Sequence, residues 1–111
     1  MVKDLFFVAR IRETARLVGT PLVFARTTDE VAAALEGEPP TLVIVDLTAN
    51  GYDYEAIFTA LERVPAVPVL GYTTHALARA TQPLHARCRR VVTKEALTQE
   101  LPELLQRGLA A

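Results

Sequence analysis

The stretch Leu42-Val43-Ile44-Val45-Asp46 decides the fold class of this 111-residue chain. Four consecutive apolar residues, most of them β-branched, end in a single carboxylate. β-Branched residues favour strands, and an apolar run without polar alternation is typical of a strand that is buried on both faces. Strands of this kind belong to parallel sheets that helices cover on both sides. The stretch therefore predicts an α/β fold in which Asp46 marks the end of a buried strand.

Similar short apolar runs alternate with helical patterns along the rest of the chain. Gly and Pro residues separate the segments, as they do at turns and helix ends. We expect strands at 5–9, 22–25, 42–45, 69–72 and 90–93, and helices at 11–18, 30–36, 54–63, 75–85 (broken at Pro83) and 95–109. This alternation predicts a single α/β domain over residues 1–111, with a parallel sheet covered on both faces.

Composition excludes several classes of protein. The chain is 50% hydrophobic and 23% charged, which is typical of a globular domain and not of a disordered segment. Its one cysteine, Cys88, excludes an internal disulfide, and no apolar run approaches the length of a membrane span. We therefore expect a cytoplasmic protein without a membrane partner. No Gly-rich phosphate loop follows the first strand and no nucleophile elbow is present, so enzyme activity is not expected.

Functional sites in open parallel sheets gather at the carboxyl ends of the strands. In this sequence, that rule selects Ala9 and Arg10, Thr27, Asp46, Thr73 and Thr74, and Lys94. A carboxylate, hydroxyl groups and an ammonium group are thereby predicted to lie at one edge of the sheet.

Three of these strand ends resemble landmarks of bacterial response-regulator receiver domains. The matching stretches are 42–46, 68–73 and 91–94. The resemblance implies a doubly wound, flavodoxin-like sheet of five strands in the order 2-1-3-4-5. It also implies that Asp46 corresponds to the phosphoryl acceptor, that Thr73 and Thr74 correspond to the switch and phosphate contacts, and that Lys94 corresponds to the phosphate-binding lysine.

The sequence departs from the receiver pattern where the metal site should be. Ala9 and Arg10 stand where the family has an acidic pair that holds Mg²⁺. The family proline after the lysine is replaced by Glu95, and its aromatic switch residue by Val91. We expect Arg10 or Arg12 to pair with Asp46 in place of a metal ion, so no metal or other cofactor is expected. This pattern is similar to that of the metal-independent pseudo-receivers.

Each of these residues also has a purely structural interpretation. Asp46 can cap its own loop or pair with Lys94, and Thr73 and Thr74 can cap the following helix. Lys94 can be an ordinary surface lysine. Cys88 is most simply a half-buried small residue.

A long stretch between Glu62 and Glu95 contains no acidic residue, and its basic residues suggest a docking surface. The candidates for this surface are Arg79, Arg87, Arg89 and Arg90. The leading hypothesis is a signalling protein that binds a protein partner, or a second copy of itself, through the face between the fourth strand and the last helix. One alternative is a phospho-accepting receiver of a two-component phosphorelay, with Asp46 as acceptor, Mg²⁺ as cofactor and a histidine kinase as partner.

A further alternative is an α/β domain that binds a small anionic ligand. Nucleic-acid binding is not expected, because the pI is about 6.1 and no aromatic residues interleave with the basic ones.

Overall fold

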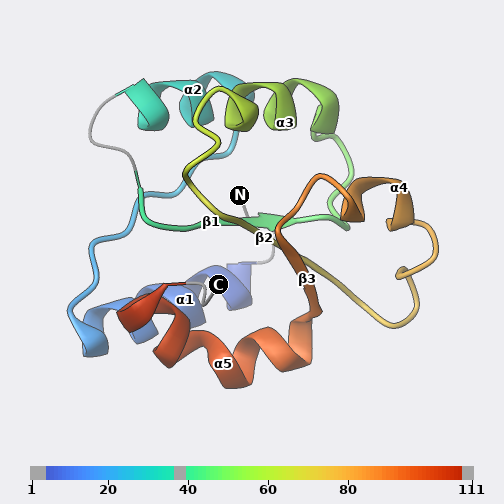
Figure 1. Ribbon diagram of the computed structural model, residues 1–111. Coiled ribbons are helices and arrows are strands. Elements are labelled where there is room, and N and C mark those ends of the chain that lie inside the picture. Colours follow the sequence, from blue (N-terminus) through green and yellow to red (C-terminus); the bar gives the residue numbers. More distant parts are fainter. Residues whose placement is uncertain (1–4, 37–39, 109–111) are drawn as a thin grey trace.

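A computed structural model describes residues 5–36 and 40–108 as a parallel sheet between two layers of helices (Figure 1). The elements in chain order are α1 (Leu5–Val18), α2 (Thr28–Glu36), β1 (Val43–Asp46), α3 (Tyr54–Glu62), β2 (Val69–Thr73), α4 (Gln82–His85), β3 (Arg90–Thr93) and α5 (Lys94–Arg107). Helices α2 and α3 cover one face of the sheet, and α1 and α5 cover the other (Figure 1). The short helix α4 lies at one end of the molecule.

The sheet of the described residues has three strands in the order β1-β2-β3, all parallel. Asp46 of β1 lies opposite Tyr72 of β2, and Thr73 lies opposite Thr93 of β3. The strands predicted at 42–45, 69–72 and 90–93 are therefore confirmed. The helices predicted at 30–36, 54–63 and 95–109 are confirmed to within a few residues at their ends, and residue 109 lies outside the described residues.

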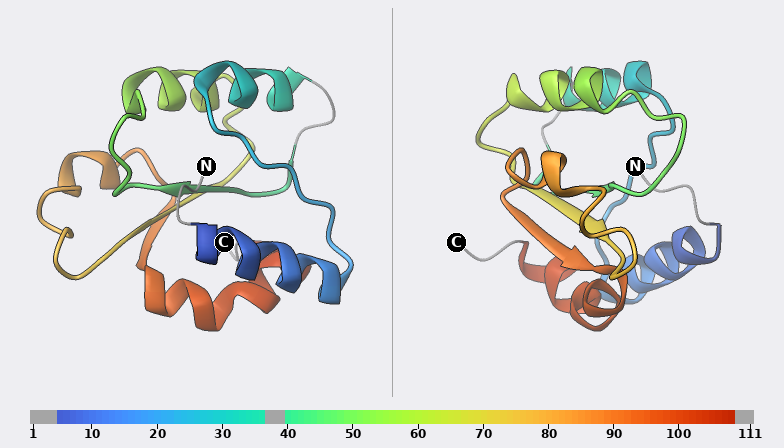
Figure 2. Two further views of the ribbon diagram at one scale, coloured as in Figure 1. Left: turned by 180° about the vertical axis from the view of Figure 1, so that it is seen from behind. Right: turned by 90° about the vertical axis from the view of Figure 1, so that its right-hand side faces the viewer.

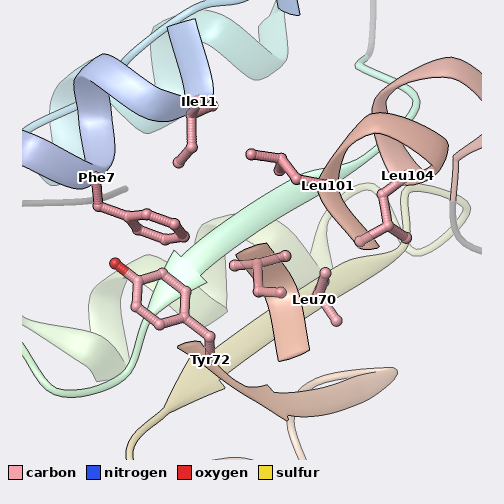
Figure 3. Close-up of a cluster of buried hydrophobic side chains, with 7 residues drawn as sticks. Phe7, Ile11, Leu70, Tyr72, Leu101 and Leu104 are labelled. Atoms are coloured by element: carbon pink, nitrogen blue, oxygen red, sulfur yellow. The ribbon is translucent and has the colours of Figure 1, made fainter. Parts of the chain in front are cut away.

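Strand β2 supplies the core with side chains on both of its faces. Leu70 and Tyr72 pack against α1 and α5, in a cluster that also includes Phe7 and Leu101 (Figure 3). The rings of Phe7 and Tyr72 meet edge to face, with centroids 5.2 Å apart. On the opposite face, Val69 joins a second cluster built mainly from β1 and α3, whose other buried members are Val31, Val45, Leu47, Ile57, Phe58 and Leu61.

The strand predicted at 5–9 is wrong, because these residues form the first turns of α1. Phe7, Ile11 and Ala15 are all buried and are spaced four residues apart, so one helical stripe runs from the apolar stretch into the predicted helix. An apolar stretch of this length fits either structure, and here the helical stripe continues through it. The helix ends at Gly19, whose φ of 73° is a conformation that glycine adopts readily.

The strand predicted at 22–25 and the five-stranded sheet of order 2-1-3-4-5 are also absent from the described residues. The chain passes irregularly from α1 in one layer to α2 in the other, beside the β1 edge of the sheet (Figure 2). Because residues 5–9 are helical, no strand lies between this segment and β1 for it to pair with. Val23 is 78% exposed, whereas Leu22 and Phe24 pack on the core.

Hydrogen bonds to two side chains hold the beginning of α2. At α2, the Glu30 amide donates to Thr27 Oγ1 at 3.1 Å, and the Arg26 amide donates to Glu30 Oε2 at 2.6 Å. This pair is similar to a capping box, but the Glu30 side chain accepts from the Arg26 amide, one residue before the Thr27 cap. The helix predicted at 75–85 is reduced to turns followed by α4, in which Pro83 occupies the first turn, where its missing N–H costs little.

Within the described ranges, no helix combines the length and the apolar character that crossing a membrane requires.

Gly71, in the middle of β2, leaves little room for an added side chain. A Cβ at this residue would lie 2.8 Å from Cys88 Sγ and 2.9 Å from Leu47 Cδ1. We predict that Gly71→Ala lowers the free energy of unfolding by about 1–3 kcal/mol, the usual cost of overpacking a filled core. Urea unfolding measures the change, and Ala33→Val on the exposed side of α2 is the control.

The double variant with Cys88→Ala tests the cause of the Gly71 effect. Removing the sulfur takes away the nearest clash, so the two substitutions should be non-additive, and the double variant should be more stable than the sum of the single effects implies. Strict additivity would contradict the assignment of the effect to this contact.

Candidate functional site at the carboxyl edge of the sheet

The three parallel strands end at one edge of the sheet and bring polar residues together there. β1 ends in Asp46, β2 ends in Thr73, and β3 ends in Thr93, which Lys94 follows. Asp46 and Thr73 are 5% and 4% exposed, so both are buried polar groups that need hydrogen-bond partners. What each can do depends on the partners that it has.

The Asp46 carboxylate is held by the residue two positions further along the chain. Its Oδ1 accepts hydrogen bonds from the Thr48 amide at 2.8 Å and from Thr48 Oγ1 at 2.6 Å. This is an Asx-type turn, in which a side-chain oxygen takes the place of a backbone carbonyl. The structural interpretation in which Asp46 caps its own loop is therefore realised in the structure.

Tyr54, the first residue of α3, closes the same loop from the other side. Its hydroxyl donates to the Asp46 carbonyl at 2.7 Å and accepts from the Ala49 amide at 3.1 Å. Burial raises the pKa of the Tyr54 phenol to about 12, and the nearby charge of Asp46 acts in the same direction. Burial and then Asp46 also raise the pKa of Tyr52, against the opposing charge of Arg26. A phenolate at either position would lie in the field of the Asp46 carboxylate.

The Thr73 hydroxyl belongs to a buried chain of hydrogen bonds that leads into α4. Thr73 Oγ1 lies 3.0 Å from Thr81 Oγ1, which lies 2.8 Å from His85 Nε2. Thr81 Oγ1 is also 3.3 Å from the Ala78 carbonyl. The end of β2 is thereby tied to Thr81, directly before α4, and through it to His85 within α4.

Thr74 and Thr93 act as local caps. The Leu77 amide donates to Thr74 Oγ1 at 3.2 Å, and the Ala96 amide donates to Thr93 Oγ1 at 3.2 Å. Lys94 is the first residue of α5, and its Nζ lies 5.1 Å from the centroid of the Phe7 ring, within the range of a cation–π contact.

The two arginines predicted to replace a metal ion lie on α1. Arg10 is exposed and, with Phe7, Glu13 and Lys94, lines an open depression of about 700 Å³. The Arg12 guanidinium carbon lies 5.0 Å from the centroid of the Phe24 ring. Within residues 5–36 and 40–108, neither arginine forms an ion pair with Asp46.

The residues at this edge do not fit a Mg²⁺ site of the receiver type. A hard divalent cation prefers several carboxylate and carbonyl oxygens around it. Across the described parts of the chain, no group of three or more His, Cys, Asp and Glu side chains could hold a metal ion. Glu13, the acidic residue nearest to the receiver metal positions in sequence, is exposed and forms an ion pair with Arg16.

The predicted basic docking residues divide into two groups. Arg87 is 23% exposed and binds Glu55 at 2.6 Å and Glu62 at 2.8 Å, with its guanidinium 5.2 Å from the Phe58 ring centroid. Arg90 binds Glu100 on α5 at 3.0 Å. These two arginines thus join elements of the fold, and Arg90, Arg79 and Arg89 are all exposed.

Sequence reasoning missed three residues that shape the site, namely Thr48, Tyr54 and Thr81. An Asp followed two residues later by Thr is a turn signal, so Thr48 could have been found. Nothing in the local sequence marks Tyr54 or Thr81, because each meets its partner only after the sheet has formed.

The comparisons with known proteins give one informative result. The chain is similar to the solved receiver domain of NtrX from Brucella abortus, with 17% sequence identity and a TM-score of 0.76. The similarity covers 96% of this chain and 92% of that one. No protein-family model matches the chain, and no curated protein matches it. The chain therefore has a receiver-like α/β fold with a parallel sheet.

The alkaline dependence of stability tests the environment of Tyr54. Because folding raises the pKa of its phenol, Tyr54 favours folding below its unfolded pKa of about 10. This contribution should be lost as the pH rises from about 10 to the folded pKa of about 12. Tyr54→Phe should remove this part of the alkaline decline in the free energy of unfolding.

Urea unfolding at several alkaline pH values measures the Tyr54 effect, and the near-ultraviolet absorbance of phenolate reports the titration itself. Lys and the other tyrosines also titrate in this range, so the quantity of interest is the difference between the wild-type chain and Tyr54→Phe. Parallel pH profiles for the two proteins would contradict the prediction.

A double-mutant cycle tests the chain of hydrogen bonds from Thr73. Either Thr73→Val or Thr81→Val should lower the free energy of unfolding by about 1–3 kcal/mol, because the first removes one partner of the Thr81 hydroxyl and the second removes the Thr81 partner of the buried Thr73 hydroxyl. The double variant should be only slightly less stable than either single variant. Additive effects in urea unfolding would show that the two hydroxyl groups do not depend on each other.

Proposed function

We propose that this chain is a receiver-like regulatory domain that acts by binding another protein and does not depend on Mg²⁺-dependent phosphorylation. The observation that carries the proposal is the state of Asp46. The sequence resemblance makes this carboxylate the counterpart of the phosphoryl acceptor of receivers, but it is buried and accepts two hydrogen bonds from Thr48. The receiver-like fold supports a signalling role, and the surroundings of Asp46 favour a structural role for its carboxylate.

Two features of the edge argue against phosphoryl transfer to Asp46. A carboxylate that attacks phosphorus needs an exposed oxygen and a cation to offset the charge of the incoming group. Oδ1 of Asp46 is occupied by Thr48, and the donor set around it does not suit Mg²⁺. The loop from Asp46 to Tyr54 is also held closed by the Tyr54 hydroxyl.

The exposed segment between β2 and α4 is the surface that best suits a partner. It presents His75, Leu77 and Arg79, and the Leu77 side chain is 40% exposed. The segment is anchored at one end by Thr74 and at the other by Thr81. A partner with an apolar residue and a carboxylate would fit this combination, since it could contact Leu77 and pair with Arg79.

The phospho-accepting alternative predicts a different behaviour of the same residues. Asp46, Thr73 and Lys94 end neighbouring strands, as an acceptor, a hydroxyl and a phosphate-binding lysine would. Under this alternative, Thr48 would have to release Asp46 Oδ1 before that oxygen could accept a phosphoryl group. Otherwise, the other carboxylate oxygen of Asp46 would have to accept it.

Amide NMR spectra with a phosphoryl mimic distinguish the two functions. We predict that adding Mg²⁺ and then beryllofluoride leaves the amide resonances of Asp46, Thr73 and Lys94 unchanged. Asp46→Asn, which cannot bind the mimic, is the matched control. Changes at these three amides in the wild-type chain that are absent from Asp46→Asn would establish the phospho-accepting function and overturn the proposal.

A further inference from the structure

An apolar groove of about 500 Å³ lies beside the β1 edge of the sheet. One wall is the irregular segment 20–25, which crosses from α1 to α2 (Figure 2), and the other is the chain at 40–44. Side chains from both helix layers also line it, with Ile11 and Leu104 from one layer and Leu61 from the other. Small-molecule sites in proteins have volumes of about 300–1,000 Å³, so this groove is large enough for a small organic ligand.

The described lining of the groove is almost wholly apolar. It includes no charged side chain, and its polar side chains are those of Thr20 and Thr41. Thr20 Oγ1 already donates to the Leu105 carbonyl at 2.7 Å, and Thr41 is exposed. A polar group of a ligand would lose its hydrogen bonds to water here without replacement, which costs free energy. The interior of the groove therefore favours a hydrocarbon chain.

A single cation lies beside this apolar interior. The Arg12 guanidinium carbon is 5.0 Å from the centroid of the Phe24 ring, and Phe24 lines the groove. Arg12 is exposed and forms no ion pair within residues 5–36 and 40–108. A guanidinium that stacks on an aromatic ring keeps the N–H donors at its edge for a carboxylate. The groove thus offers apolar walls and one positive charge next to them.

We propose that this groove is a binding site for a linear carboxylate with a hydrocarbon tail, of the medium-chain fatty acid class. The tail would lie between the two walls, where it leaves water and needs no hydrogen bonds. The carboxylate would stay in the solvent beside Phe24 and accept charge-assisted hydrogen bonds from Arg12. A peptide fits this combination less well, because it carries a backbone N–H and C=O at nearly every residue.

The ligand site is separate from the edge that carries Asp46, which does not line the groove. It lies instead where the two hydrophobic clusters meet. Leu42 and Ile44 pack on the cluster of α1 and α5, and Val43 packs on the cluster of α3. A bound tail would therefore contact both helix layers at once. The proposal goes beyond the proposed function and does not depend on it.

Amide NMR titrations with hexanoate, octanoate and decanoate, each below the concentration at which it aggregates, test for the tail site. We expect the amide resonances of Val23, Ala34 and Val43 to change. Because burial of one methylene group contributes about 0.8 kcal/mol, the Kd should fall about fourfold for each methylene added. Equal affinities for the three acids, or changes confined to residues outside the groove, would overturn the proposal.

A charge-removing variant tests the carboxylate contact. Arg12→Gln should weaken decanoate binding about two- to fivefold, as expected for an exposed ion pair, and should leave the binding of decanol unchanged. Arg16→Gln is the matched control, because Arg16 is an exposed arginine one helical turn further along α1 that pairs with Glu13. Equal losses for decanoate and decanol in Arg12→Gln would contradict the assignment of the carboxylate to this residue.

A space-filling variant tests the position of the tail. Ala34 lines the groove from α2, so Ala34→Phe should abolish decanoate binding. Ala33→Phe places the same ring on the exposed side of α2 and should bind decanoate as the wild-type chain does. Far-ultraviolet circular dichroism verifies that both variants are folded. If Ala34→Phe does not fold, the chain-length series and Arg12→Gln decide the question without it.

Two further outcomes would give the groove to another occupant. Changes at the same amides when the chain is concentrated without ligand, together with a dimer in size-exclusion chromatography, would show that a second copy fills the groove. That result would overturn the assignment to a fatty acid. Unchanged amide spectra with all three acids at millimolar concentration would equally overturn it.

Discussion

The structure depends on the burial of β2 along its whole length. All residues of this strand are buried, and it is the strand that pairs with both of its neighbours. Its alternating side chains supply Leu70 and Tyr72 to one hydrophobic cluster and Val69 to the other. Leu47 and Cys88 fill the space that a side chain at Gly71 would occupy. Burial also raises the pKa of the Cys88 thiol to about 11, which is consistent with a packing role for this cysteine.

The parallel sheet determines where the candidate site lies, but it does not determine the chemical role of the residues there. Parallel strands bring Asp46, Thr73 and Lys94 to one edge whatever their function is. The contacts around them then decide what each can do. Asp46 is engaged by Thr48, and Thr73 is engaged by Thr81, so both side chains have partners within the fold. A receiver-like position is thus compatible with a structural role, and the fold alone does not determine the reaction.

The elements that were predicted correctly have hydrophobic patterns that fit only one kind of secondary structure. The strands that end at Asp46 and Thr73 are apolar and bounded by turn signals, and the helix that contains Ile57, Phe58 and Leu61 has a clear buried stripe. The strand ends predicted Asp46, Thr73 and Lys94 as one group of residues at the edge. The partners Tyr54 and Thr81 could not be predicted, because their contacts depend on how loops of the folded chain meet.

The N-terminal segment was mispredicted for a different physical reason. Residues 5–9 satisfy both patterns at once, since every residue is apolar and Phe7 also continues the helical stripe of Ile11 and Ala15. As a helix, the segment gains the contact of Phe7 with Tyr72 and the cation–π contact with Lys94.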